Sequence, residues 1–276
     1  MSVKIVVDSS VDLTPEVKAQ VKTVALSVLF GEQEYKDGVT INPEKFYEKL
    51  VECETLPTTS QPTPASFEDA YRELVEAGHE VLVITIASKL SGTYQSATIA
   101  ADEFPGKVLV LDSRNAAIGA GLLAMSALKL AEEGLSAQQI LEVLMEKRKK
   151  VRLYAMVDTL EYLKKGGRLS SAVAFVGGVL NLKPIISVVD GELQVVGKAR
   201  GLKAAFTTLT KACQETGVDM AEPYMLGYTG VSDENLSKYM AEHAEMWPAD
   251  SDKVIIGSAI GTHAGPGAVA VAFYAE

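Results

Sequence analysis

Apolar runs of strand length alternate with amphipathic stretches in the first half of the chain. The runs lie at residues 3–7, 81–87 and 108–111, and their length is typical of buried strands. Helix-start signals, in which a capping side chain is followed directly by proline, occur at Thr14-Pro15, Asn42-Pro43 and Thr63-Pro64. Further helical patterns cover residues 116–133 and 136–150. This alternation predicts a parallel sheet flanked by helices.

The second half has a different pattern, in which hairpin signals join helical ones. Asp190-Gly191 separates two apolar alternations within residues 185–196, which favours a hairpin. The other expected strands lie at residues 153–157, 224–228, 254–260 and 268–273, and the expected helices at 202–216 and 233–247. We therefore expect an N-terminal parallel α/β domain at residues 1–155 and a C-terminal α+β domain with a mixed or antiparallel sheet at residues 156–276.

Two long segments carry no charged side chain. Residues 169–182 are expected to form a helix that either is buried in the core or faces a ligand. Residues 254–275 contain Thr262, His263 and a Gly-Pro-Gly break, so two strands joined by a loop explain them better than a membrane span. The N-terminus lacks the apolar core of a signal peptide. These features predict a cytoplasmic protein without stable membrane insertion.

Charge and composition narrow the class of function. The 276 residues carry a net charge of −10, which argues against a phosphate-backbone partner, and so we expect no nucleic acid. A dense basic run at residues 147–152 is interpreted as the C-terminal end of a helix, where cations interact favourably with the helix dipole. The three histidines are scattered, and Cys53 and Cys213 lack CxxC spacing. This predicts no metal site, and reduced thiols.

Hydroxyl-rich loops are the first candidates for a binding site. Thr59 and Ser60 lie in a proline-stiffened loop that leads into a helix, and Ser91 and Gly92 lie between a buried strand and a helix. A helix N-terminus offers free N–H groups and a positive dipole, which together suit a carboxylate or a phosphate. Each loop taken alone is also explained by capping and turn formation.

Arg168 and His263 are the candidates from the second half. Arg168 follows two glycines and offers a fork of donors to an anion. His263 lies in a glycine-rich loop, expected to be a tight turn between strands, where it would approach a ligand closely. Asp8 and Asp12 are interpreted as capping residues rather than cation ligands. Gly119 and Gly121 match a relaxed dinucleotide fingerprint but do not follow a strand directly, so we expect them to serve helix packing.

Taken together, these segments resemble the DegV family. The resemblance rests on motifs in family order, which are Asp8-Ser9-Ser10 with Asp12-Leu13, Thr59-Ser60-Gln61-Pro62, residues 90–97, residues 158–168, Lys198-Ala199-Arg200-Gly201 and residues 261–267. The set spans nearly the whole chain. As an ordered series it is far more specific than any one of its members.

The resemblance implies the two-domain DegV fold and a lipid-carrier function. An apolar tunnel would hold one long-chain fatty acid, and Ser91 with Thr59 or Ser60 would contact its carboxylate, with Gly92, Arg168 and His263 around it. The partner would be an ATP-dependent fatty acid kinase that forms an acyl-phosphate on the bound lipid. The chain would then be a non-catalytic monomer without a cofactor other than its lipid.

Two other classes stay open from the residues alone. A Ser91–His263 pair oriented by Asp8 would suit a serine hydrolase or a small-molecule transferase, although Ser91 lacks the GxSxG context of a nucleophile elbow. A DNA-associated regulator is disfavoured by the acidic balance. Turnover of short acyl esters and salt-sensitive DNA binding would separate these classes from a carrier.

Overall fold

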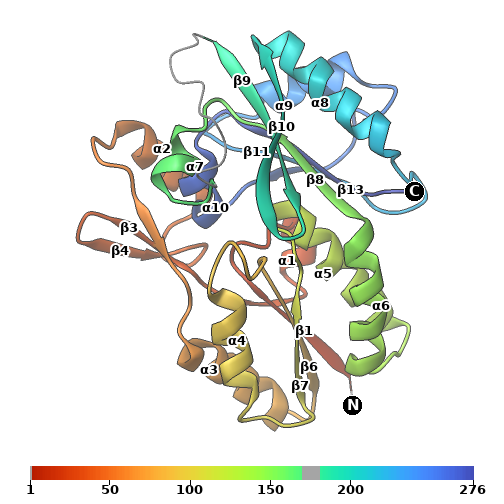
Figure 1. Cartoon of the computed structure of the whole chain (residues 1–276). Coiled ribbons are helices and arrows are strands. Elements are labelled where there is room, and N and C mark those ends of the chain that lie inside the picture. Colours follow the sequence, from red (N-terminus) through yellow and green to blue (C-terminus); the bar gives the residue numbers. More distant parts are fainter. Residues whose placement is uncertain (1, 170–180) are drawn as a thin grey trace.

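A four-stranded parallel sheet forms the first half of the protein, which was analysed as a computed structural model that describes residues 2–169 and 181–276 (Figure 1). Its strands lie in the order β2-β1-β6-β7, with all neighbouring pairs parallel. Their bounds are β1 (Val3–Asp8), β2 (Lys22–Val24), β6 (Glu80–Thr85) and β7 (Val108–Asp112). The parallel sheet predicted from the alternating pattern is confirmed.

Helices cover both faces of this sheet, and the alternation of side chains along each strand explains why. Val6 and Val83 face a cluster with Tyr71 and Ala97, from helices α3 (Pro64–Glu76) and α4 (Thr93–Ala101). The intervening residues of the strands belong to a second cluster with α5 (Ala117–Glu132) and α6 (Ala137–Lys150). The short helix α1 (Pro15–Lys18) connects β1 to β2 and is capped by Thr14, as predicted.

A six-stranded mixed sheet forms the second half, in the order β10-β9-β8-β13-β11-β12. Its strands are β8 (Val151–Met156), β9 (Leu182–Val189), β10 (Glu192–Arg200), β11 (Met225–Tyr228), β12 (Lys253–Ile255) and β13 (Val269–Tyr274). β9 and β10 form the predicted hairpin. Helices α8 (Leu202–Thr216) and α9 (Glu234–Glu242) cover one face with an aromatic-rich core. The mixed α+β half is thus confirmed, while the boundary at residue 155 stays a prediction.

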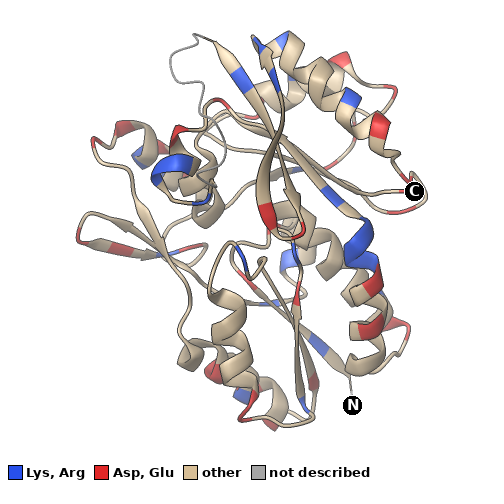
Figure 2. Ribbon diagram, viewed as in Figure 1, with Lys and Arg blue, Asp and Glu red and all other residues tan. Residues whose placement is uncertain are grey.

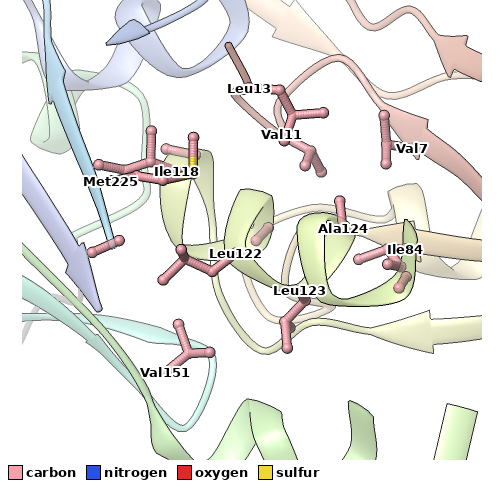
Figure 3. Close-up of a cluster of buried hydrophobic side chains, with 14 of the residues drawn as sticks. Val7, Val11, Leu13, Ile84, Ile118, Leu122, Leu123, Ala124, Val151 and Met225 are labelled. Atoms are coloured by element: carbon pink, nitrogen blue, oxygen red, sulfur yellow. The ribbon is translucent and has the colours of Figure 1, made fainter. Parts of the chain in front are cut away.

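Helix α5 lies between the two sheets. On one side its residues pack toward Val7 and Ile84 of the first sheet, and on the other toward Val151 and Met225 of the second (Figure 3). Because a helix in this position is buried all round, it carries apolar residues on every face, Leu122 and Leu123 among them. The helix therefore joins the two sheets into one core.

A small third sheet was not predicted. It is antiparallel, in the order β4-β3-β5, from β3 (Ser27–Phe30), β4 (Gln33–Lys36) and β5 (Thr58–Ser60). Its core is shared with Phe46 and Tyr47 of α2 (Pro43–Glu52). Helices α7 (Glu161–Lys165) and α10 (Ser258–Ala264) lie beside it (Figure 1).

The expectation for residues 254–268 was wrong. The strand predicted at 254–260 ends at Ile255, and the glycine-rich segment expected to be a turn forms helix α10. Side chains from the first half of the chain cap this helix. The Gly257 N–H donates to Asp12 Oδ1 (2.7 Å), and the N–H groups of Ser258 and Ala259 donate to the Asp37 carboxylate (3.0 and 3.1 Å). Because the caps come from a distant part of the sequence, no local signal marks the start of the helix.

Two further sequence expectations have different outcomes. Asp8 does stabilise a turn, since its carboxylate accepts from the Ser10 and Ile86 N–H groups, but Asp12 holds α10 instead of capping α1. The helix expected at residues 169–182 falls largely on 170–180, which lie outside the described residues. Within the described part of the chain, no helix combines the length and apolar character that crossing a membrane requires.

The buried aspartates predict an unusual pH dependence of stability. Burial raises the pKa of Asp8 and Asp37, and it raises that of Asp12 well above its usual value, with a further contribution from the nearby negative charge of Asp37. Asp12 Oδ2 is also buried without a partner. A carboxyl whose pKa is raised by folding stabilises the native state below the unfolded pKa, about 3.9. That stability is lost as pH rises through the folded-state pKa.

Replacing Asp12 with asparagine is therefore expected to stabilise the protein at neutral pH. In Asp12→Asn, the amide oxygen keeps the Gly257 hydrogen bond and the buried negative charge beside Asp37 is removed, so the free energy of unfolding at pH 7 should rise by about 1–3 kcal/mol. Urea unfolding at pH 5 and pH 7 measures the change, with the exposed Asp252→Asn as a control. If Asp12→Asn is no more stable than wild type at pH 7, ionisation of Asp12 does not lower the free energy of unfolding.

Candidate functional site

An apolar cavity lies between the mixed sheet, the start of α5 and helix α10. It measures about 870 Å³ including its open mouth. Most of its lining is aliphatic, and the polar lining residues are Ser10, Thr59, Ser91, Arg168, Thr229 and His263. The cavity therefore suits a ligand that is mainly apolar.

Side-chain size along β13 and β8 creates this space. Ala268 and Ala270 face the cavity, whereas the intervening Val269 and Val271 pack on the opposite face of the sheet. Ala270 pairs with Ala155 of β8, which also lines the cavity. Successive residues of a strand point to opposite faces, so the alternation of alanine with larger residues leaves the cavity face of β13 and the neighbouring Ala155 without bulk.

Thr59 and His263 come together at one end of the cavity. Thr59 Oγ1 lies 2.8 Å from His263 Nε2. Burial, together with the positive charge of Arg168, lowers the pKa of His263 to about 4, so its imidazole is neutral at pH 7. His263 Nδ1 is buried without a partner among the described residues, and the nearby positive charge of Arg168 favours the tautomer that is protonated at Nε2. Thr59 then accepts from His263, and its own hydroxyl proton is free to donate to a ligand.

Arg168 joins the loop after β6 to the end of α7. Its Nε donates to the Leu90 carbonyl (3.3 Å) and its Nη1 to the Gly166 carbonyl (2.6 Å). The next residue in that loop, Ser91, exchanges a hydrogen bond with Thr93 Oγ1 (2.8 Å) and accepts from the Thr93 N–H. Arg168 thereby holds a positive charge at the loop that carries Ser91, and both residues line the cavity.

Gly166 allows the imidazole of His263 to take this position. A Cβ on Gly166 would overlap His263 Nδ1, so any larger residue would displace the ring from Thr59. Helix α7, which ends at Gly166, packs against α10. The Gly166-Gly167-Arg168 segment therefore contributes to the site through close packing as well as through the guanidinium.

Thr59, Arg168 and His263 also line a second, more polar depression on the outer surface. Its other lining residues include Glu54, Lys165 and Thr262. The same three side chains line the inner cavity. They therefore stand between an apolar interior and a polar surface, which is where a ligand with an apolar chain and an anionic end would have its charge solvated and paired.

The structure brings together four of the six residues singled out in the sequence. Thr59, Ser91, Arg168 and His263 line the cavity. Ser60 is exposed, because alternation along β5 turns it away from the face of Thr59. Gly92 begins α4 and packs against the Gln61 side chain rather than lining the cavity. The assignment of these six residues to ligand binding stays a prediction.

Two polar lining residues were missed by the sequence reasoning. Ser10 belongs to the Asp8-Ser9-Ser10 turn, and Thr229 follows β11. Thr229 already accepts from the Ala268 N–H (2.8 Å), so its hydroxyl has a structural partner. Neither residue stands out in the sequence, because an isolated hydroxyl after a strand has the same pattern as an ordinary turn.

Comparison with known proteins gives consistent matches over the full length. The family model described as an uncharacterised protein of the DegV family matches residues 2–276. A DegV domain-containing protein from Deinococcus radiodurans is 38% identical over 279 residues, which cover 99% of this chain and 98% of that protein.

Solved structures match the fold as closely. A DegV family protein from Thermus thermophilus, described for its fatty acid binding, superposes with a TM-score of 0.89 at 35% identity and full coverage of both chains. A stearic acid-binding protein from Eubacterium ventriosum superposes with a TM-score of 0.84 at 30% identity, over 99% of this chain and 98% of that one.

Proposed function

Because the chain belongs to the DegV family, we propose that it binds one long-chain fatty acid and holds the carboxylate at the end of the cavity formed by Thr59, Ser91, Arg168 and His263. The observation that carries this proposal is an otherwise apolar cavity that meets a polar depression at Thr59, Arg168 and His263. The structural relatives described as fatty acid-binding or stearic acid-binding support the ligand class.

The energetics are consistent with such a ligand. Each buried methylene contributes roughly 0.8 kcal/mol, so about 12 methylenes supply on the order of 10 kcal/mol before the cost of ordering the chain. The carboxylate loses water on entry, and Arg168 with the hydroxyls of Thr59 and Ser91 compensates for that loss. Neutral His263 adds no charge, but it orients the Thr59 proton toward the ligand.

We further propose that the chain is a non-catalytic carrier whose partner is an ATP-dependent fatty acid kinase. The sequence has no GxxxxGK[ST] loop for ATP, so the phosphoryl donor would come from the partner. The carboxylate would lie beside the outer depression, where Lys165 carries a positive charge. Lys198 and Arg200 are exposed on β10 and are further candidates for docking. A monomer would keep this surface open to the kinase.

The hydrolase alternative gains no support from the hydrogen bonds. A nucleophilic serine needs a base within hydrogen-bond reach, yet Ser91 Oγ is bonded to Thr93 and His263 Nε2 is bonded to Thr59. Asp8, the suggested orienting acid, is occupied by Ser10 and Ile86.

Mass spectrometry of an organic extract tests the fatty acid proposal directly. The purified protein should release about one equivalent of a C16–C18 fatty acid per chain, of whose methylenes the burial arithmetic above counts about 12. In a direct binding assay, Thr59→Val and Ser91→Ala should each weaken affinity about tenfold through loss of a charge-assisted hydrogen bond. The matched control Ser60→Ala, on the opposite face of β5, should leave affinity unchanged. An extract that stays empty after incubation with free fatty acids would contradict the proposal.

A further inference from the structure

A third pocket, distinct from the apolar cavity and from the polar depression beside it, is strongly basic. It measures about 760 Å³ with its opening, and its lining includes Arg114, Arg148, Lys149 and Arg152, with Asn115, Val151, Val188, Val189 and Asp190 completing it. The basic run at residues 147–152 closes α6 and opens β8, where Lys and Arg gather in Figure 2. In a chain with a net charge of −10, four cationic side chains around one concavity need an explanation beyond a helix end.

The arginines of this pocket are not neutralised within the protein. Among residues 2–169 and 181–276, no carboxylate forms an ion pair with Arg114, Arg148 or Arg152. The nearby Asp112 carboxylate accepts from the N–H groups of Ser88 and Arg114 and from the Ser88 hydroxyl. Lys149 is paired with Glu146. Asp190 is the one carboxylate that the described residues contribute to the lining, which leaves an excess of positive charge there.

Arg148 has a donor aimed at no partner. Its Nη1 donates to the Asp112 carbonyl (2.7 Å), while its Nε is buried and unpaired among the described residues. Burial, followed by the positive charge of Arg114, lowers the pKa of the Arg148 guanidinium, so the two cations are close enough to repel each other. An anion bound in the pocket would relieve that repulsion.

We propose that this pocket binds the phosphate group of a small phosphorylated molecule. Planar guanidinium forks match phosphate oxygens in pairs, and the pocket is larger than a single phosphate needs. Its apolar wall of Val151, Val188 and Val189 suits the rest of such a molecule. Val188 of β9 also lines the apolar cavity, so the apolar cavity and the basic pocket share one side chain.

Titration calorimetry with inorganic phosphate and with glycerol 3-phosphate, at constant ionic strength, tests the proposal. At least one probe should bind with a Kd below about 1 mM. If only inorganic phosphate binds, the ligand is free phosphate. If glycerol 3-phosphate binds more tightly than inorganic phosphate, the ligand is a phosphate monoester. Arg114→Gln should weaken binding about tenfold or more. The Arg114 side chain is exposed and makes no hydrogen bond to the described residues, so this variant should fold normally.

Two further variants separate a built site from charge alone. Arg148→Lys keeps the positive charge but loses the fork and the Nε donor, and it should also lose affinity about tenfold. Lys211→Gln removes one exposed charge from α8, far along the chain from this pocket, and should bind like wild type. Failure of both probes to bind with a Kd below about 1 mM, or an equal loss of affinity in Lys211→Gln, would overturn the proposal. Fatty acid content should be unchanged in all three variants, so this outcome is independent of the lipid proposal.

Discussion

We expect that replacing Ala270 with phenylalanine leaves a folded protein that no longer retains a fatty acid. Ala270 lies on β13 opposite Ala155 of β8, and both line the apolar cavity. A phenyl ring at this position would project from the cavity face of the sheet into the space that the acyl chain would occupy. Because the ring fills existing space instead of entering a packed core, the stability of the lipid-free protein should be kept.

Extraction and mass spectrometry measure the lipid content, and thermal unfolding of the lipid-free protein checks the fold. Ala270→Phe should retain less than about a tenth of the wild-type fatty acid, because losing more than 1.4 kcal/mol of binding is enough for a tenfold change. Ala270→Val adds less volume, so its fatty acid content should lie between those of wild type and Ala270→Phe. Ala204→Phe adds the same ring on the exposed face of α8 and should have no effect. Full lipid content in folded Ala270→Phe would mean that the acyl chain lies elsewhere.

The parallel sheet and its helices were predictable because their signals are local. β6 and β7 contain continuous apolar runs, and β1 contains one that only Lys4 interrupts. Three of the helices begin with a capping side chain followed by proline. The β9–β10 hairpin follows from Asp190-Gly191, both of which adopt positive φ angles. In each case the residues that determine the structure lie within the element itself.

The third sheet and α10 were not predictable because their determinants lie far apart in sequence. β5 is three residues long and is defined by pairing with β3, about thirty residues earlier. The N–H groups at the start of α10 are satisfied by Asp12 and Asp37. A long uncharged run without a local cap reads equally well as strand or helix.

The candidate site, like α10, depends on residues that lie far apart in the sequence. Thr59, Ser91, Arg168 and His263 come from β5, the β6–α4 loop, the end of α7 and α10, so no spacing rule joins them. Residue chemistry and loop position made each a candidate, and the resemblance to a family whose motifs occur in order joined them into one site. Thr59 could not be distinguished from Ser60 in this way, because the choice depends on which face of β5 meets the cavity, and that strand was not predicted.

Gly121→Ala is expected to destabilise the protein strongly, against the trend of helix propensity. In an exposed helix, replacing glycine with alanine stabilises by about 1 kcal/mol. In α5, however, a Cβ on Gly121 would overlap the backbone oxygen of Asp12 and lie 3.1 Å from Met225 Sδ. A backbone atom cannot rotate away as a side chain can. We therefore expect a loss of about 2–3 kcal/mol in the free energy of unfolding, as overpacking of a dense core typically costs.

Gly119→Ala is the matched comparison in the same helix. Its Cβ would overlap the end of the Asn115 side chain, which can move at the cost of its bond to the Ala116 N–H, so urea unfolding should show a smaller loss. Because Asp12 also holds the start of α10 through Gly257, displacing it should disturb His263 and lower fatty acid retention in Gly121→Ala more than in Gly119→Ala. Equal stability of the two variants would show that the Asp12 loop yields freely. The packing of α5 would then not be what fixes α10 in place.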